Sequence, residues 1–190
     1  MRHHIKKILC LTGMPGCGKS IVKEVALSHG VTVITMGDVV REETAKRGLD
    51  PNAENTGKVM LELRKKLGLD AVAKKCIEKL MEMDEVSDIV MFDGVRSMHE
   101  VERFRTLSKN IVIIAIHSSP KTRFERLHKR GRVDDIRSWE EFVERDKREL
   151  SVGIGDVIAL ADIMLVNEGK SLEEFRREVD KLFREVLLDE

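Results

Sequence analysis

The chain has 190 residues, of which 42% are hydrophobic and 36% charged, which indicates one domain with a substantial core and a heavily charged surface. Its 34 basic and 34 acidic residues cancel, so we expect no nucleic-acid binding through bulk positive charge. The three scattered cysteines form no disulfide framework, and no apolar run is long enough for a signal peptide or a membrane span, which predicts a cytoplasmic protein with no membrane contact.

The first half of the chain predicts two strands separated by a helix, and then a long helical region. Lys6–Leu11 is a short apolar run that ends in a glycine-rich turn, so it predicts a buried strand, with a helix following over residues 19–28. Val31–Thr35 is rich in β-branched residues and predicts the second strand. From Asp38 to about Met83 the pattern is helical, with breaks at glycines.

The second half adds three strands and three helices. Ile89–Phe92 and Ile111–Ile116 are continuously apolar, as strands covered on both faces are, and Ile163–Val166 predicts the last strand. Capping residues predict three helix starts, at Ser119-Pro120, at Ser138 with Glu141, and at Ser171 with Glu174. Strands that alternate with helices indicate a parallel sheet with helices on both faces, which is a three-layer α/β/α fold.

The most specific motif lies between the first predicted strand and the first predicted helix. It matches the phosphate-binding pattern G-x-x-x-x-G-K-[ST] in full and reads Gly13-Met14-Pro15-Gly16-Cys17-Gly18-Lys19-Ser20. Glycines let backbone N–H groups curl around phosphate oxygens, and the following helix directs its positive dipole end at the same anion. We expect Lys19 to contact the β- and γ-phosphates and the Ser20 hydroxyl to bind magnesium. Residues 13–20 therefore predict a P-loop that binds a nucleoside triphosphate together with Mg²⁺.

Two aspartates follow predicted strands at the edge where the phosphate crevice is expected. Asp93 comes directly after Ile89–Phe92, where a carboxylate can hold magnesium directly or through water, or can cap a loop. Asp38 follows the second strand and has two interpretations. It is either a base or magnesium-shell group, or the N-cap of a helix that starts near Val39.

Basic residues cluster after the fourth predicted strand. Arg123, Arg126 and Arg130 recur at spacings of three and four, so they lie on one face of a predicted helix, and Arg132 follows. Guanidinium groups on a segment that folds over the phosphates would neutralise charge as a phosphoryl group moves. That reading makes Arg126, Arg130 and Arg132 catalytic. The alternative is a solvated face whose charges pair with neighbouring carboxylates such as Glu125.

Three segments beyond the P-loop carry a family resemblance. Residues 36–41, M-G-D-V-V-R, look like the T-G-D-x-x-R segment of adenylate kinases, and residues 93–96, D-G-V-R, are similar to their D-G-F-P-R but one residue shorter. Residues 161–169 are similar to the A-D-x-x-x-x-N-x-G strand and turn of dephospho-coenzyme A kinases. The chain thus resembles, nearly end to end, the nucleoside monophosphate kinase and dephospho-coenzyme A kinase branch of P-loop proteins, and most of all an adenylate-kinase-related group.

The resemblance implies a single P-loop kinase-like domain over residues 1–190, with the P-loop NTPase fold and a five-stranded parallel sheet in the order 2-3-1-4-5. It also implies an acceptor-binding helical excursion at about 38–83 and a short lid at about 126–148. Arg41 and Arg96 would hold the phosphate of the acceptor, whereas Asn167 and Gly169 would lie against the adenine of ATP.

The function that the resemblance implies is transfer of the γ-phosphoryl group of Mg·ATP to a small phosphate-bearing acceptor, a nucleoside monophosphate with AMP foremost. The glutamine with which adenylate kinases select AMP has no counterpart, because the chain contains no glutamine. Three alternatives stay open. They are a dephospho-coenzyme A-type hydroxyl kinase with Asp38 as base, an ATPase that works with a protein or ribonucleoprotein partner, and a nucleotide sensor that turns over poorly.

Overall fold

A parallel β-sheet forms the centre of the computed structural model, which describes residues 4–130 and 138–188. Its five strands are β1 (Lys7–Thr12), β2 (Thr32–Thr35), β3 (Ile89–Asp93), β4 (Ile111–His117) and β5 (Ile163–Val166). They are hydrogen-bonded in the order β2-β3-β1-β4-β5, and every neighbouring pair is parallel. The predicted fold class and strand order are therefore confirmed, and each predicted strand matches an observed one to within one residue at either end.

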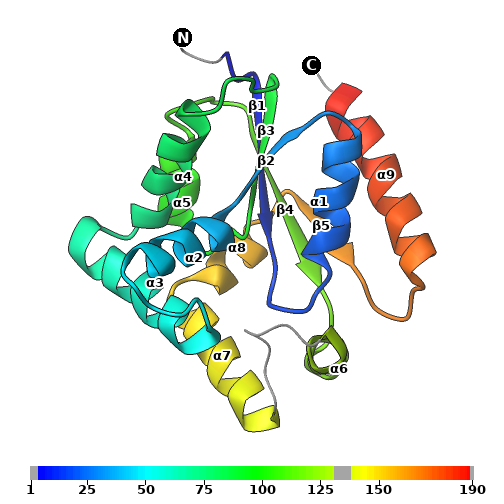
Figure 1. Cartoon of the computed structure of the whole chain (residues 1–190). Helices are drawn as coiled ribbons and strands as arrows, with labels where there is room; N and C mark the ends of the chain where they lie inside the picture. The colour runs from blue at the N-terminus through cyan, green and yellow to red at the C-terminus, as the bar shows by residue number, and fades with distance from the viewer. Residues whose placement is uncertain (1–3, 131–137, 189–190) are drawn as a thin grey trace.

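Helices cover both faces of the sheet (Figure 1). One face carries α1 (Lys19–Ser28) and α9 (Leu172–Leu188), which pack together. The other side holds α2 (Met36–Lys46), α3 (Ala53–Leu67), α4 (Ala71–Met81), α5 (Met98–Phe104) and α8 (Ile154–Ala159). Beyond the carboxyl ends of the strands lie α6 (Pro120–Arg130) and α7 (Trp139–Ser151). None of the helices in the described part of the chain is long and apolar enough to cross a membrane.

The central strand β1 supplies two hydrophobic cores through the alternation of its side chains. Ile8 and Cys10 are fully buried on the side of α2 to α5, whereas Leu9 and Leu11 are fully buried against α1 and α9. Helices α2, α3 and α4, which the sequence predicts as an excursion, contribute buried residues to the first of these cores. They are therefore packed on the sheet as part of its helical layer.

The structure corrects one predicted helix start and adds two short helices. Helix α2 starts at Met36 with Thr35 as its N-cap, so Asp38 lies in the first helical turn and its interpretation as an N-cap is wrong. The sequence patterns did not predict α5 and α8, which have seven and six residues. Helix α5 is capped by Ser97, whose hydroxyl accepts from the backbone N–H of Glu100 (3.3 Å). This short helix follows the loop that leaves β3.

Candidate functional site

The phosphate loop joins β1 to α1, and close packing requires its glycines. Gly13 (φ 142°) lies against β4, where an added Cβ would sit 2.6 Å from the carbonyl oxygen of Ile116. Gly18 (φ 110°) is the N-cap of α1, and a Cβ there would meet the side-chain nitrogen of Asn167 at 2.4 Å. A side chain is excluded at both positions. The loop is therefore held against β4 and the turn after β5, with the N-terminus of α1 lining a cleft.

Lys19 folds back onto the loop that precedes it. Its Nζ donates to the carbonyl oxygens of Gly13 (2.5 Å) and Met14 (3.5 Å). Ser20 follows at an exposed position in the first turn of α1, and both residues line the cleft. The ammonium and the hydroxyl that the motif assigns to phosphate and metal are therefore adjacent, and a phosphate would replace two backbone carbonyl contacts of Lys19.

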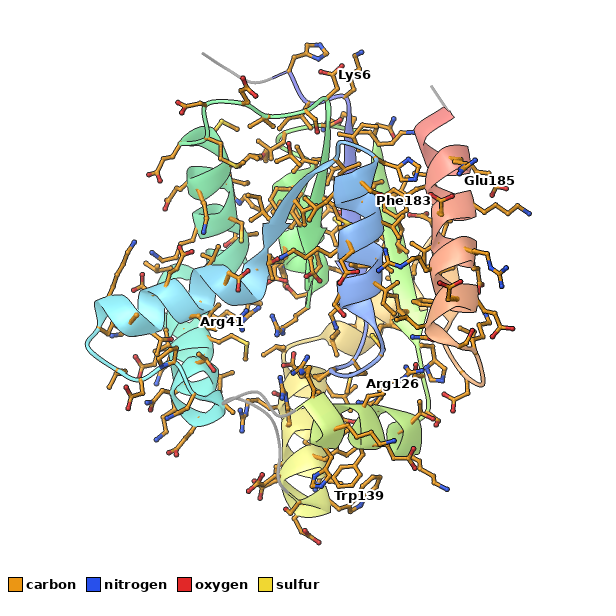
Figure 2. The ribbon with its side chains drawn as sticks, turned by 45° about the vertical axis from the view of Figure 1, so that its right-hand side comes forward. Lys6, Arg41, Arg126, Trp139, Phe183 and Glu185 are labelled. Carbon is orange, nitrogen blue, oxygen red and sulfur yellow. The ribbon has the colours of Figure 1, made fainter. Side chains whose placement is uncertain are left out.

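The cleft lies at the carboxyl ends of the strands and has a volume of about 670 Å³. Ligands of open α/β sheets bind in this position, where the strand order reverses. Of the described residues that line the cleft, nine are cationic and three are acidic, although the chain as a whole is neutral. The cationic residues are Lys19, Lys23, Arg41, Arg96, Arg126, Arg130, Arg145, Lys170 and Arg176. Figure 2 shows Arg41 by α2 on the left and Arg126 by α6 on the right.

Asp93, at the end of β3, fits a magnesium ligand. The residue is 8% exposed, and its Oδ1 has no hydrogen-bond partner among the described residues. Burial raises the pKa of the Asp93 carboxyl above its usual value, although Lys19, Lys23 and Arg96 oppose this shift. Within the described chain, no group of three or more His, Cys, Asp or Glu could hold a metal alone. Magnesium here would take Asp93 and Ser20 and complete its shell with phosphate oxygens and water, as this ion commonly does.

Near β4 and β5, Arg126 and Asn167 support the phosphate loop. The Arg126 guanidinium donates to Ser118 Oγ (3.0 Å) and to the carbonyl oxygen of Asn167 (3.0 Å). The side-chain amide of Asn167 donates to the carbonyl oxygen of Cys17 (2.9 Å). Gly169 lies two residues further on, in an exposed turn with φ 65°. Asn167, expected to lie against adenine, thus also anchors the loop that would hold the phosphates.

The cleft is also lined by Arg41 and Arg96, the two arginines that the family resemblance assigns to the acceptor. Arg41 forms an ion pair with Asp38 in the same helix, and their side chains are 38% and 45% exposed. Arg96, in the loop after β3, pairs with Glu149 of α7 and donates to the carbonyl oxygen of Gly94 (3.3 Å). Both guanidinium groups therefore reach one cavity, and each already has a carboxylate partner.

The basic cluster of residues 123–132 is divided between two environments. Arg126 and Arg130 line the cleft, whereas Arg123 is 4% exposed and pairs with Asp146 of α7. Arg132 lies outside the described residues, so its catalytic role stays a prediction. The expected lid at 126–148 comprises the end of α6 and most of α7 around this undescribed stretch. The basic face that the spacing predicts is therefore divided. Arg126 and Arg130 line the cleft, whereas Arg123 is held in a buried ion pair.

Lys23 is a cleft residue that the sequence analysis overlooks. It follows Lys19 by four residues on α1, and its Nζ donates to Thr35 Oγ1 (2.6 Å) at the end of β2. Lys23 also lies close enough to Asp93 to oppose the rise in the pKa of that carboxyl. The spacing of four places both lysines on one helical face, and this signal could have found it.

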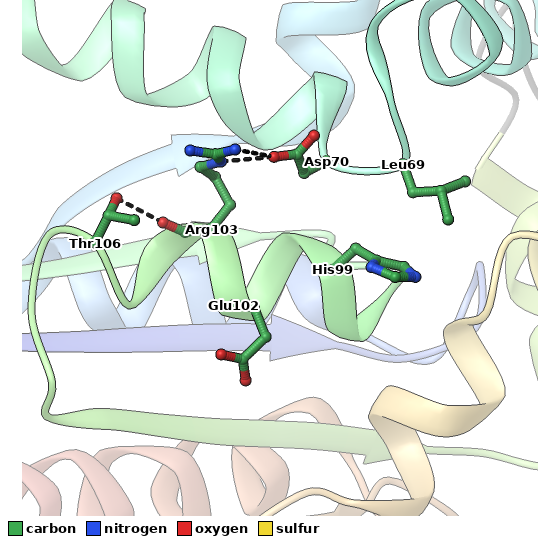
Figure 3. Close-up of a pocket in the computed structure, with 6 residues that line it drawn as sticks. All are labelled: Leu69, Asp70, His99, Glu102, Arg103 and Thr106. Carbon is green, nitrogen blue, oxygen red and sulfur yellow. Dashed lines mark hydrogen bonds and ion pairs between the residues drawn. The ribbon is translucent and has the colours of Figure 1, made fainter.

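A second hollow, of about 490 Å³, lies between the turn that precedes α4 and helix α5 (Figure 3). Arg103 donates from Nε to Asp70 Oδ2 (2.6 Å), and Lys74 pairs with Oδ1 (2.9 Å). Burial raises the pKa of Asp70, but Lys74 and Arg103 outweigh it and hold this pKa below its usual value. Asp70 occupies the N-cap position of α4 without bonding to the helix backbone. These charges satisfy one another and join α4 to α5, so we assign this hollow a structural role.

Comparison with known proteins identifies the family. A family model described as an AAA domain matches residues 12–143, which include the phosphate loop, Asp93 and Arg126. A UPF0200 protein of Thermococcus onnurineus is 51% identical over 185 residues, which cover 96% of this chain and 99% of the relative. The chain belongs to the UPF0200 family.

The UPF0200 chain also shares its fold with solved structures of low sequence identity. TT1252 from Thermus thermophilus aligns with a TM-score of 0.64 at 19% identity, covering 96% of this chain and 98% of that one. A gluconokinase from Sinorhizobium meliloti 1021 aligns with a TM-score of 0.54 at 15% identity, covering 97% of this chain and 95% of that one. At these identities the likeness concerns the fold alone, a three-layer α/β/α domain.

Proposed function

We propose that this UPF0200 protein is an ATP-dependent phosphotransferase whose acceptor carries a phosphate, a nucleoside monophosphate with AMP foremost. The observation that carries the proposal is the shared cleft, because the phosphate loop, Asp93, Arg41 and Arg96 all line one cavity of about 670 Å³. This volume falls in the range of about 300–1,000 Å³ that is typical of small-molecule sites. The excess of cationic residues matches the negative charge of two phosphorylated ligands.

In this proposal ATP binds with its triphosphate on the phosphate loop and its base towards Asn167. Lys19 holds the β- and γ-phosphate oxygens, and the positive end of α1 faces the same phosphates. Ser20 and Asp93 would hold magnesium, which neutralises charge between the β- and γ-phosphates when bound. Arg130, on the lid side, would meet the charge that develops as the phosphoryl group moves.

Arg41 and Arg96 make a phosphate-bearing acceptor the best fit. Each guanidinium can bind two phosphate oxygens in a planar fork, and a bare hydroxyl acceptor has no need of two such forks. With both ligands in one cleft, an acceptor phosphate oxygen attacks the γ-phosphorus in line, and ADP leaves with the electrons of the broken bond. Catalysis then depends on positioning and charge stabilisation, without a covalent protein intermediate.

Asp38 supports a second candidate, a kinase that phosphorylates a hydroxyl group. Its side chain lines the cleft and is 45% exposed, so it is accessible as a base for an acceptor hydroxyl. That carboxylate is paired with Arg41 and would have to leave this partner to take a proton. We therefore rank the monophosphate acceptor first.

Product analysis with ATP labelled in its γ-phosphate tests the proposal. The protein is incubated with Mg·ATP and, in turn, with each nucleoside monophosphate and with dephospho-coenzyme A, and Lys19→Ala serves as the negative control. We expect a labelled nucleoside diphosphate from the wild type only. Labelled product from dephospho-coenzyme A alone would favour the hydroxyl kinase, and free phosphate alone would favour an ATPase with a protein or ribonucleoprotein partner. Absence of any turnover would refute both kinase candidates.

A further inference from the structure

Glu149 is a buried carboxylate beside the cleft for which the proposed reaction has no use. It lies near the end of α7, is 6% exposed, and accepts from both Nε and Nη2 of Arg96, the second at 3.4 Å. Burial raises the pKa of Glu149, but Arg96, Arg145 and Lys19 outweigh this effect and hold the pKa below its usual value. All three of these cations line the main cleft. The ionised carboxylate of Glu149 thus lies near three cationic side chains at the wall of the cleft.

The backbone of Arg96 is fixed independently of Glu149. Its N–H donates to Glu100 Oε2 (2.7 Å), and the other oxygen of this fully buried carboxylate pairs with Arg64 of α3. Loss of the contact with Glu149 would therefore leave the main chain of Arg96 in place and leave its guanidinium with only the carbonyl oxygen of Gly94 (3.3 Å) among the partners described above. The guanidinium is the part of the residue that a phosphate would bind.

A small pocket lies next to this ion pair. Its volume is about 60 Å³, far below the roughly 300 Å³ of the smallest typical ligand sites. It is lined by Gly37, Val40, Ala53, Thr56, Gly57, Met60, Arg96, Arg145, Arg148 and Glu149. Arg148 borders it from α7, since its Nη1 donates to the carbonyl oxygen of Ala53 (3.3 Å) and would lie 2.5 Å from a Cβ on Gly57. The ion pair and the small pocket therefore share helix α7.

We propose that Glu149 competes internally for the site of the acceptor's phosphate: its carboxylate holds Arg96 in the free protein and is displaced when that phosphate binds. Arg145, Arg148 and Glu149 lie within five residues of α7, so displacement moves them together and enlarges the small pocket. This inference deepens the proposed function and rests on it for the identity of the acceptor, but the exchange at Arg96 can be tested without it.

The exchange follows from charge balance. A phosphate monoester carries a charge of about −1.5 to −2 at pH 7 and three strong acceptor oxygens, so it satisfies Arg96 at least as well as a carboxylate does. Removal of Glu149 without a replacement would leave the partly buried charge of Arg96 without an anionic partner in this ion pair, which is costly. A phosphate therefore has to take its place in the same step. A ligand without a phosphate or comparable anion cannot do so.

The substitution Glu149→Gln tests the exchange, because glutamine keeps the shape of the side chain and removes its charge. The probes are AMP and inorganic phosphate, titrated by calorimetry into protein that is saturated with a non-hydrolysable Mg·ATP analogue. Arg96→Ala is the matched control, because it removes the shared partner, and the double variant completes the cycle. We expect Glu149→Gln to bind the probes about tenfold more tightly than the wild type, and the gain to vanish without Arg96.

If a folded Glu149→Gln protein binds both probes no more tightly than the wild type does, the proposal is overturned and the role of Glu149 is structural. Thermal melting checks the fold. If the glutamine variant is unstable, Glu149→Asp, which keeps the charge but reaches less far, has to show a gain in the same direction. If AMP binds to neither protein while phosphate still binds Glu149→Gln more tightly, the exchange holds and the monophosphate acceptor fails. If neither probe binds to either protein, both ideas fail.

Steady-state kinetics provides a second readout. If the acceptor displaces Glu149 and ATP does not, Glu149→Gln should lower the KM for AMP about tenfold and leave the KM for ATP unchanged. A purely structural role would instead disturb both KM values together or lower kcat alone. Either of those patterns would count against the exchange.

Discussion

Arg123 and Asp146 join α6 to α7 through a bidentate ion pair. Nη1 of Arg123 lies 2.9 Å from Oδ1 and Nη2 lies 2.5 Å from Oδ2 of Asp146, and the guanidinium stands 4.8 Å from the ring centre of Phe142. The same Nη1 donates to the carbonyl oxygen of Pro15 in the phosphate loop (3.1 Å). Because these contacts occupy the guanidinium fork, Arg123 supports the site without facing the ligand.

We therefore expect Arg123→Ala to lower the free energy of unfolding by about 3–5 kcal/mol, the usual cost of breaking a buried ion pair from one side. Urea denaturation measures the change. Arg184→Ala is the control, because Arg184 pairs with Asp180 from a side chain that is 70% exposed, and its cost should stay within about 0.5 kcal/mol. Equal unfolding midpoints for the two variants would contradict the structural role of Arg123.

The two arginines of α6 that line the cleft should give different kinetic defects. Arg126→Ala removes contacts to Ser118 and Asn167 that support the phosphate loop, so we expect ATP affinity to fall about tenfold. Arg130→Ala leaves those contacts intact and should lower kcat by about 100-fold with little change in ATP affinity. Calorimetry with an ATP analogue and initial-rate assays separate the two effects. Identical profiles would mean that the two arginines share one role.

Asp93→Asn should stabilise the ligand-free protein at neutral pH. A carboxyl group whose pKa is raised by folding holds its proton more tightly in the folded state, so its ionisation costs stability once the pH exceeds the unfolded pKa of about 3.9. The neutral amide avoids that cost. We expect the melting temperature at pH 7 to rise by about 2–4 °C, the shift that ~1 kcal/mol causes in a protein of this size.

The same variant should lose the stabilisation that Mg²⁺ adds in the presence of an ATP analogue, because one metal ligand is gone. The gain in melting temperature without ligand should disappear at a pH below about 4, where the wild-type carboxyl is protonated in both states. A lower melting temperature of Asp93→Asn at pH 7 would contradict the sign of the pKa shift. If Mg²⁺ raises the melting temperature of Asp93→Asn as much as that of the wild type, Asp93 is not a ligand of the metal.

Gly18→Ala should destabilise the protein more than Gly30→Ala. Both glycines have positive φ, 110° and 76°, so both substitutions carry a backbone cost of about 1–2 kcal/mol. At Gly30 the added Cβ meets no atom within 4 Å, whereas at Gly18 it would lie 2.4 Å from the side chain of Asn167. The difference in melting temperature between the variants therefore measures how tightly Asn167 packs on the phosphate loop. Equal melting temperatures would show that Asn167 moves aside without cost.

The strands and most helix starts could be predicted because their signals are local. Short apolar runs predicted the strands, and Ser171 with Glu174 forms the expected reciprocal cap of α9. The seven-residue helix α5 is too short for an apolar period, although the spacing of Ser97 and Glu100 carries a capping signal. Glu149 could not be recognised, since in the sequence it is one more glutamate on a charged helix. Its burial depends on Arg96, 53 positions away.

The position of β1 between β3 and β4 separates the strands β2 and β3 from the strands β4 and β5. The strands on one side lead into Arg41 and Arg96, and those on the other lead into Arg126 and Asn167. Under the proposed function, substitutions in residues 36–104 that keep Asp93 would alter the contacts to the acceptor and leave the nucleotide contacts beyond β1 unchanged. We expect a chimera that takes this segment, with Asp93 retained, from a relative with another acceptor to show the new preference and to keep its affinity for ATP.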